Sequence, residues 1–79
     1  MVTREQVEPG VRIVENDPEE PNDNPYKGTV TGIEESGEGI FLVAIDLDQE
    51  FMEKEHYQTM CPEGKMLCFP WAIDVLTDE

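Results

Sequence analysis

Three side chains in this sequence are soft metal ligands or nucleophiles, namely His56, Cys61 and Cys68. A structural zinc site uses four nitrogen or sulfur ligands in a near-tetrahedral array, so a carboxylate such as Glu55 or Asp74 would have to complete the set. The spacing of these residues matches no established zinc pattern. We therefore interpret the two cysteines as buried thiols that pack like small hydrophobic residues, and we expect no metal and no other cofactor.

Catalysis needs a nucleophile and a base, and the chain offers few residues for either role. Cys61 and His56 are one candidate pair, whereas the single serine, Ser36, lies in a glycine-rich turn far from His56 in the sequence. No glycine-rich phosphate-binding loop follows a predicted strand. A domain this small encloses little water-free volume for a substrate, so we expect a protein that is not an enzyme.

Carboxylate and amide oxygens, which calcium prefers, are concentrated at residues 16–24. This segment lacks the central glycine and the twelfth-position glutamate of an EF-hand loop, and residues 46–50 fail the same test. Its prolines fit a stiff, extended turn. We interpret it as a solvated acidic loop whose carboxylates can contact a protein partner. The candidate partner-binding residues in it are Asp17, Glu19, Glu20 and Asp23.

Aromatic side chains point to a surface that a partner would bind. Tyr26 ends the acidic loop, and Pro70 and Trp71 lie in a short segment near the end of the sequence. We expect these residues to converge on one side of the molecule, with Tyr57 beside them. Rigid aromatic contact area next to carboxylates suits a protein with a basic or proline-containing surface. Trp71 is equally expected to fill the core, and the sequence leaves both roles open.

The charge of the chain restricts its partners. Nineteen acidic residues against five basic ones give a net charge of −14. Nucleic acids and anionic membranes are bound by clustered lysine and arginine, which are scattered here, so we expect neither as a direct partner, although solubility alone also explains the charge. No apolar stretch approaches the roughly 18–20 residues that span a bilayer, and no secretory signal is present, so we expect a cytoplasmic protein.

Short apolar and β-branched runs, separated by proline, glycine and asparagine, predict a mostly β domain. The expected strands are residues 11–14, 26–35, 40–45 and 74–76, with two more beside a tight turn at 60–66. The run at 40–45 is the most apolar and is expected to be a central strand covered on both faces. Residues 46–57 fit either a helix or a strand, and we favour a short helix or irregular structure.

Seventy-nine residues make one domain with one modest core. Residues 1–10 are expected to form a short leader, in which Thr3 and Gln6 can cap one helical turn. Residues 11–76 are expected to form the domain, and residues 77–79 a tail.

The expected order is five or six short strands, with a long acidic loop after the first strand and a 3₁₀ turn before the last. Three segments carry a further signal: residues 9–13 (PGVRI), 26–30 (YKGTV) and 69–76 (FPWAIDVL). They resemble the opening, the second strand and the closing segment of SH3-like barrels of the KOW type and of the small photosystem I accessory subunit. The predicted fold class is therefore a small all-β SH3-like barrel, whose closure would remove exposed sheet edges.

This resemblance implies a docking or accessory role, because such barrels usually bind other components. Those that touch nucleic acid carry basic loops, whereas the matching loops here are acidic. We therefore predict a small acidic, non-enzymatic accessory or protein-interaction module. The alternative is an acidic decoy that imitates phosphate spacing and blocks a basic nucleic-acid-binding protein, which the net charge of −14 permits.

Overall fold

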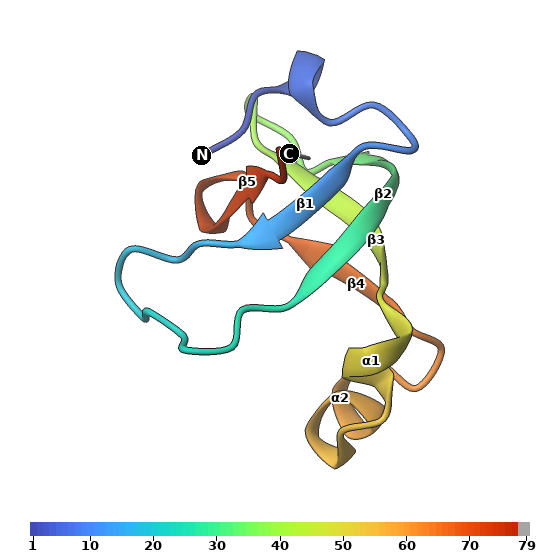
Figure 1. Cartoon of the computed structure of the whole chain (residues 1–79). Helices are drawn as coiled ribbons and strands as arrows, with labels where there is room; N and C mark the ends of the chain where they lie inside the picture. Colours follow the sequence, from blue (N-terminus) through green and yellow to red (C-terminus); the bar gives the residue numbers. More distant parts are fainter. Residues whose placement is uncertain (78–79) are drawn as a thin grey trace.

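The computed structural model describes residues 1–77 and consists mainly of β-strands (Figure 1). Five strands form one sheet in the order β4-β3-β2-β1-β5, and every neighbouring pair is antiparallel. The strands are β1 (Arg12–Glu15), β2 (Lys27–Glu35), β3 (Phe41–Leu47), β4 (Lys65–Cys68) and β5 (Ile73–Val75). The predicted all-β class is confirmed, and residues 78–79 of the predicted tail lie outside the described residues.

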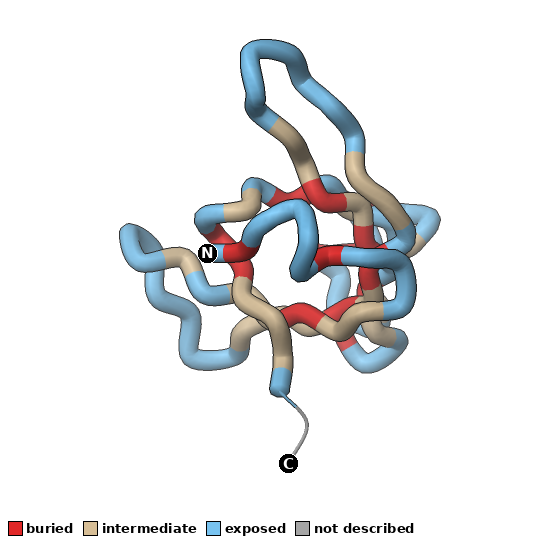
Figure 2. Tube along the Cα trace, turned by 90° about the horizontal axis from the view of Figure 1, so that it is seen from above, coloured by how far each residue is buried: buried red, intermediate tan, exposed pale blue. Residues whose placement is uncertain are grey.

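The sheet is open, which corrects the prediction of a closed barrel. β4 and β5 form its two edges, and no strand pairing joins them in the part of the chain that the structure describes. The two edge strands have only four and three residues, and a 3₁₀ turn separates them along the chain. The chain nevertheless curves around a common centre, with the exposed positions mainly in the loops (Figure 2). Short edge strands therefore leave backbone groups available at both ends of the sheet.

β3 is covered on one face only, which corrects the prediction of a central strand covered on both. Val43, Ile45 and Leu47 are buried, whereas the residues between them are half-buried or exposed. This period of two is that of a strand with one face on the core and the other toward solvent. The middle position of the sheet belongs to β2.

The residues after β3 form two short helices, α1 (Gln49–Met52) and α2 (Glu55–Met60). This confirms the favoured interpretation of residues 46–57. The strand predicted directly before the turn at residues 60–66 is wrong, because α2 occupies that stretch and turns Tyr57 into the core. None of the described helices is long or apolar enough to cross a membrane.

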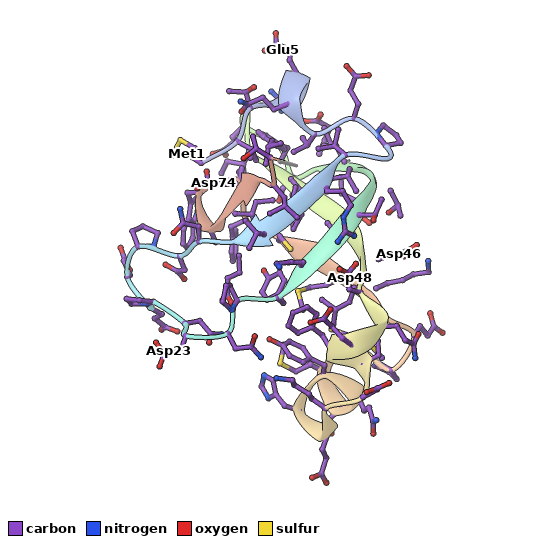
Figure 3. All side chains as sticks on the ribbon, viewed as in Figure 1. Met1, Glu5, Asp23, Asp46, Asp48 and Asp74 are labelled. Atoms are coloured by element: carbon purple, nitrogen blue, oxygen red, sulfur yellow. The ribbon has the colours of Figure 1, made fainter. Side chains whose placement is uncertain are left out.

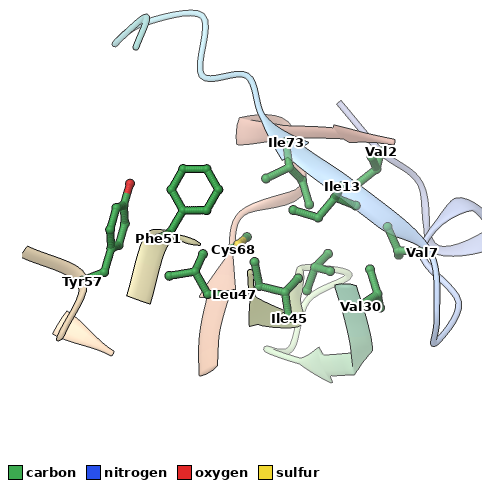
Figure 4. Packing of buried hydrophobic residues seen from close by; sticks show 11 residues of the cluster. Val2, Val7, Ile13, Val30, Ile45, Leu47, Phe51, Tyr57, Cys68 and Ile73 are labelled. Atoms are coloured by element: carbon green, nitrogen blue, oxygen red, sulfur yellow. The ribbon is translucent and has the colours of Figure 1, made fainter. Parts of the chain in front are cut away.

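The hydrophobic core runs from the N-terminal segment to α2 (Figure 4). Val2 and Val7 lie near Ile13 at one end, and Phe51 and Tyr57 lie at the other. The two valines are 3% and 0% exposed, so the first ten residues contribute directly to the core. Burial of this continuous cluster is the main favourable term for so small a domain.

Two other predicted features are confirmed. In the N-terminal segment, the Thr3 N–H donates to Gln6 Oε1 at 2.9 Å and closes the 3₁₀ turn η1 (Arg4–Gln6). A second 3₁₀ turn, η2 (Pro70–Ala72), leads directly into β5. The long loop between β1 and β2 extends away from the sheet (Figure 1), and Asp23 lies at its far end (Figure 3).

Candidate functional site

A cleft of about 450 Å³ lies between the long loop and α2. We call it the acidic cleft. The residues that line it are Glu15, Glu20, Pro21, Asn22, Tyr26, His56, Tyr57, Met60, Met66 and Leu67. It therefore joins the long loop to α2 and the edge strand β4, which both lie much further along the chain.

Two tyrosines form an aromatic corner in this cleft. The ring centroids of Tyr26 and Tyr57 are 6.3 Å apart, and the ring planes meet at 75°. Tyr57 is held from two further sides, by Phe51 at 6.0 Å and by His56 at 4.9 Å between centroids. Because Phe51 is fully buried and Tyr57 is 8% exposed, the corner is anchored in the core.

The phenol groups of the corner stay neutral. The Tyr26 hydroxyl lies 3.4 Å from the buried Cys68 Sγ, and burial followed by the neighbouring Cys68 raises the pKa of Tyr26 well above its usual range. Burial raises the pKa of Tyr57 as well, with Glu15 adding to the effect. At neutral pH these rings therefore present uncharged aromatic faces, and the negative charge of the cleft comes from its carboxylates.

The carboxylates stand at the loop side of the cleft. Asn22 Nδ2 donates to Glu15 Oε1 at 3.1 Å, which ties the loop to the end of β1. None of the described residues that line the cleft is a lysine or an arginine. Three of the chain's basic side chains pair with carboxylates elsewhere, in the pairs Arg4–Glu35, Arg12–Asp48 and Lys65–Asp46. Among the described residues that line the cleft, no lysine or arginine therefore neutralises Glu15 or Glu20.

The rest of the loop holds its carboxylates in ordered turns. Asp17 Oδ1 accepts the Glu19 N–H at 2.9 Å, and Asn22 Oδ1 accepts the Asn24 N–H at the same distance. Such side-chain turns are typical of aspartate and asparagine in loops. Of the predicted binding carboxylates, only Glu20 lines the cleft, whereas Asp17, Glu19 and Asp23 lie along the loop outside it. They extend the negative surface beside the cleft.

Pro70 and Trp71 lie on a different hollow of about 370 Å³, which we call the apolar patch. It is lined by Gly39, Ile40, Phe41, Phe69, Pro70 and Trp71. The Phe69 and Trp71 rings stack at 5.0 Å with an interplanar angle of 12°. Trp71 is 42% exposed, so of the two roles that the sequence leaves open the structure favours the surface.

The structure thus places five of the eight predicted binding residues in two separate hollows and the other three along the loop outside both. It brings Tyr26, Tyr57 and Glu20 together, and it does not bring Pro70 and Trp71 to them. Sequence reasoning missed Glu15, Leu67, Ile40 and Phe69 as surface contacts. Glu15 ends β1, Leu67 lies within β4, and Ile40 and Phe69 adjoin strands, and no local pattern states which hollow such a residue lines.

The structure buries the two cysteines and places His56 at the acidic cleft. Within residues 1–77, no group of three or more histidine, cysteine or acidic side chains is arranged to hold a metal ion. Cys61 and Cys68 are unpaired and buried, and burial raises the pKa of both thiols. A raised pKa disfavours the thiolate that nucleophilic chemistry needs. His56 lines the acidic cleft and packs on Tyr57.

Comparisons with protein-family models, with curated proteins and with solved structures found no match for this chain.

Proposed function

We propose that this protein is a non-enzymatic interaction module that binds a basic segment of another protein in the acidic cleft. The observation that carries the proposal is the aromatic corner of Tyr26 and Tyr57 placed beside Glu15 and Glu20 in one hollow. Each part of this arrangement suits one part of a lysine or arginine side chain. The proposal does not require the apolar patch.

A long basic side chain matches the cleft chemically. Its apolar stem can pack against Tyr57 and Met60, while its charge lies near an aromatic face and a carboxylate. Charge-assisted hydrogen bonds to Glu15 or Glu20 would be stronger than neutral ones. The net charge of −14 would also raise the rate at which a basic partner is encountered.

We also propose that the fold is an open variant of the SH3-like barrel. Three features support this: the strand order β4-β3-β2-β1-β5, the long loop after β1, and the 3₁₀ turn directly before β5. Two free, buried thiols agree with a reducing compartment, and we propose that the module acts in the cytoplasm.

Calorimetric titration of the full chain with a blocked hexalysine peptide tests the binding proposal. We expect saturable binding at low salt and none for blocked hexaglutamine. The double variant Glu15→Gln/Glu20→Gln should weaken binding by about tenfold or more. The control Glu5→Gln/Glu8→Gln removes the same charge from an exposed N-terminal site and should weaken it much less. Absence of hexalysine binding would overturn the proposal.

The same pair of variants separates this function from the acidic decoy. A decoy presents many carboxylates as a phosphate-like array, so its affinity depends on total charge and falls steeply with salt. Equal losses for the cleft variant and for the N-terminal control would therefore favour the decoy. A loss confined to the cleft variant would favour the interaction module.

A further inference from the structure

One edge of the sheet opens directly into the acidic cleft. β4 has β3 as its only neighbour among the described strands, and its residues Met66 and Leu67 line the cleft. Leu67 is 48% exposed, so its side chain is accessible to a partner at this edge. Exposed strand edges tend to pair with another chain unless charge, proline or a covering segment blocks them.

The pairing register shows which backbone groups of β4 are available. In the β3–β4 pair, Met66 lies opposite Ile45, and the Leu47 N–H donates to the Gly64 carbonyl at 2.7 Å. In antiparallel pairs, residues with hydrogen bonds to the partner strand alternate with residues that have none. The Gly64 carbonyl and the backbone groups of Met66 and Cys68 therefore point toward β3, and the residues between them point theirs away.

The outward residues are Lys65 and Leu67. Within residues 1–77, no hydrogen bond outside the β3–β4 pair involves the backbone N–H or C=O of either residue. No proline interrupts β4, and the Lys65 side chain pairs with Asp46 at 3.0 Å. Lys65 and Leu67 are alternate residues of β4, so one further antiparallel strand can hydrogen-bond to both.

The opposite edge is less suited to such pairing. β5 has only three residues, and the N-terminal segment lies against this end of the molecule. The Met1 amine pairs with Asp74 in β5, and the Val2 N–H donates to the Pro70 carbonyl at 3.0 Å.

We propose that the partner binds as an extended strand along the outer edge of β4, with alternate basic side chains entering the acidic cleft. This inference rests on the proposed function and adds its binding mode. Strand addition contributes main-chain hydrogen bonds to affinity. Every second side chain of the bound segment faces the cleft, whose carboxylates select for a basic residue at those positions. Charge complementarity identifies the occupant as a lysine- or arginine-bearing segment of another protein. A second copy of this chain is disfavoured, because each copy carries a charge of −14.

Backbone methylation of a probe peptide tests the binding mode. The probe is a blocked heptapeptide of alternating lysine and valine, and two derivatives carry N-methyl groups on either all the valine or all the lysine amides. A strand pairs through alternate amides, so one derivative should lose about tenfold or more in affinity while the other binds like the parent. Equal affinities of all three peptides, with lysine-dependent binding retained, would overturn strand addition and leave the proposed function standing. Failure of every lysine peptide to bind would overturn both.

A variant of the protein gives an independent test. Leu67→Pro removes an N–H that β3 does not use, so the sheet should persist while peptide affinity falls by about tenfold. The control Leu67→Ala keeps the N–H and should lose less. If Leu67→Pro does not fold, hydrogen exchange on the unaltered chain tests the binding mode. Exchange of the Lys65 and Leu67 amides should slow when the parent peptide binds. Unchanged exchange at both, or protection in a peptide-free dimer, would contradict the proposal.

Discussion

The acidic cleft and the apolar patch both present aromatic rings, but the rings differ in what supports them. In the cleft, Tyr57 is 8% exposed and rests on the buried Phe51. In the patch, Phe69 and Trp71 stack mainly on each other and are 52% and 42% exposed. The surroundings differ as well, because carboxylates line the cleft, whereas none of the described residues that line the patch is charged.

Because of this difference, substitutions in the two regions report on different properties, namely stability in the cleft and surface contacts in the patch. A ring that is both part of the core and part of a binding surface cannot be removed without destabilising the fold, so its truncation says little about binding. A ring that is half-exposed can be removed at small cost. The cleft is therefore best probed through its carboxylates and the β4 edge, and the patch through its rings. Substitutions of comparable residues in and around the two regions should therefore differ in their effects.

The largest expected contrast is between Phe51→Ala and Phe69→Ala. Phe51 is 1% exposed, so its truncation should cost about 3–5 kcal/mol in the free energy of unfolding. Phe69 is 52% exposed, and its truncation should cost less than about 1 kcal/mol. Urea unfolding followed by circular dichroism measures both. Similar losses for the two variants would show that the patch is as much a part of the core as the cleft floor.

The next contrast concerns two ion pairs, one beside α1 and one beside the apolar patch. Arg12 holds Asp48 with two hydrogen bonds of 2.6 Å beside α1, whereas Arg4 pairs with Glu35 and lies 4.7 Å from the centre of the Phe41 ring at the patch. The Arg12–Asp48 pair is the less exposed of the two. At neutral pH, Asp48→Asn should cost about 1 kcal/mol, and Glu35→Gln should cost less.

The cost of Asp48→Asn should depend on pH. Hydrogen bonds from Arg12 lower the pKa of Asp48 in the fold. A carboxyl with a lowered folded pKa contributes stability above its unfolded pKa and loses it as pH falls through the folded value. The difference between the original chain and Asp48→Asn should therefore shrink from about pH 4 toward pH 2. Denaturant midpoints at several pH values measure it, and a difference that grows on acidification would reverse the assignment.

The smallest contrast is between Tyr26→Phe and Trp71→Phe. Tyr26→Phe removes a hydroxyl that lies 3.4 Å from the buried Cys68 Sγ, which should cost about 0.5–1 kcal/mol. Trp71→Phe keeps an aromatic ring on a half-exposed stack and should change stability by less than about 0.5 kcal/mol. Thermal unfolding of both variants in parallel shows which substitution costs more stability. A larger loss for Trp71→Phe would contradict the description of the patch as peripheral.

Much of the fold could be predicted because each strand coincides, within one or two residues, with a run of β-branched and apolar residues. The one strand predicted in error is the one expected before the turn at 60–66. That stretch fits both the period of a helix and the period of a strand, and the burial of Tyr57 favours the helix α2. The burial of Val2 and Val7 depends on tertiary contacts, and isolated valines in a polar segment give no sign of it.

The candidate site was only partly predictable, for a geometric reason. The residue types were identified from the sequence, and Tyr26, Tyr57 and Glu20 do meet in one cleft. Which hollow Trp71 joins depends on how η2 sits against the sheet, and this follows from packing that no short motif encodes. The free edge of β4 depends on the openness of the sheet, whereas the predicted barrel would have covered it.

The most direct test of binding in the acidic cleft is a titration of the full chain with the alternating lysine–valine peptide, monitored by amide and indole NMR shifts. Trp71 is the single tryptophan, so its indole N–H reports on the patch alone. We expect shift changes at Tyr57, Lys65 and Leu67 and an unmoved Trp71 indole signal. Changes centred on Trp71 and Ile40, with the cleft residues unmoved, would contradict binding in the acidic cleft.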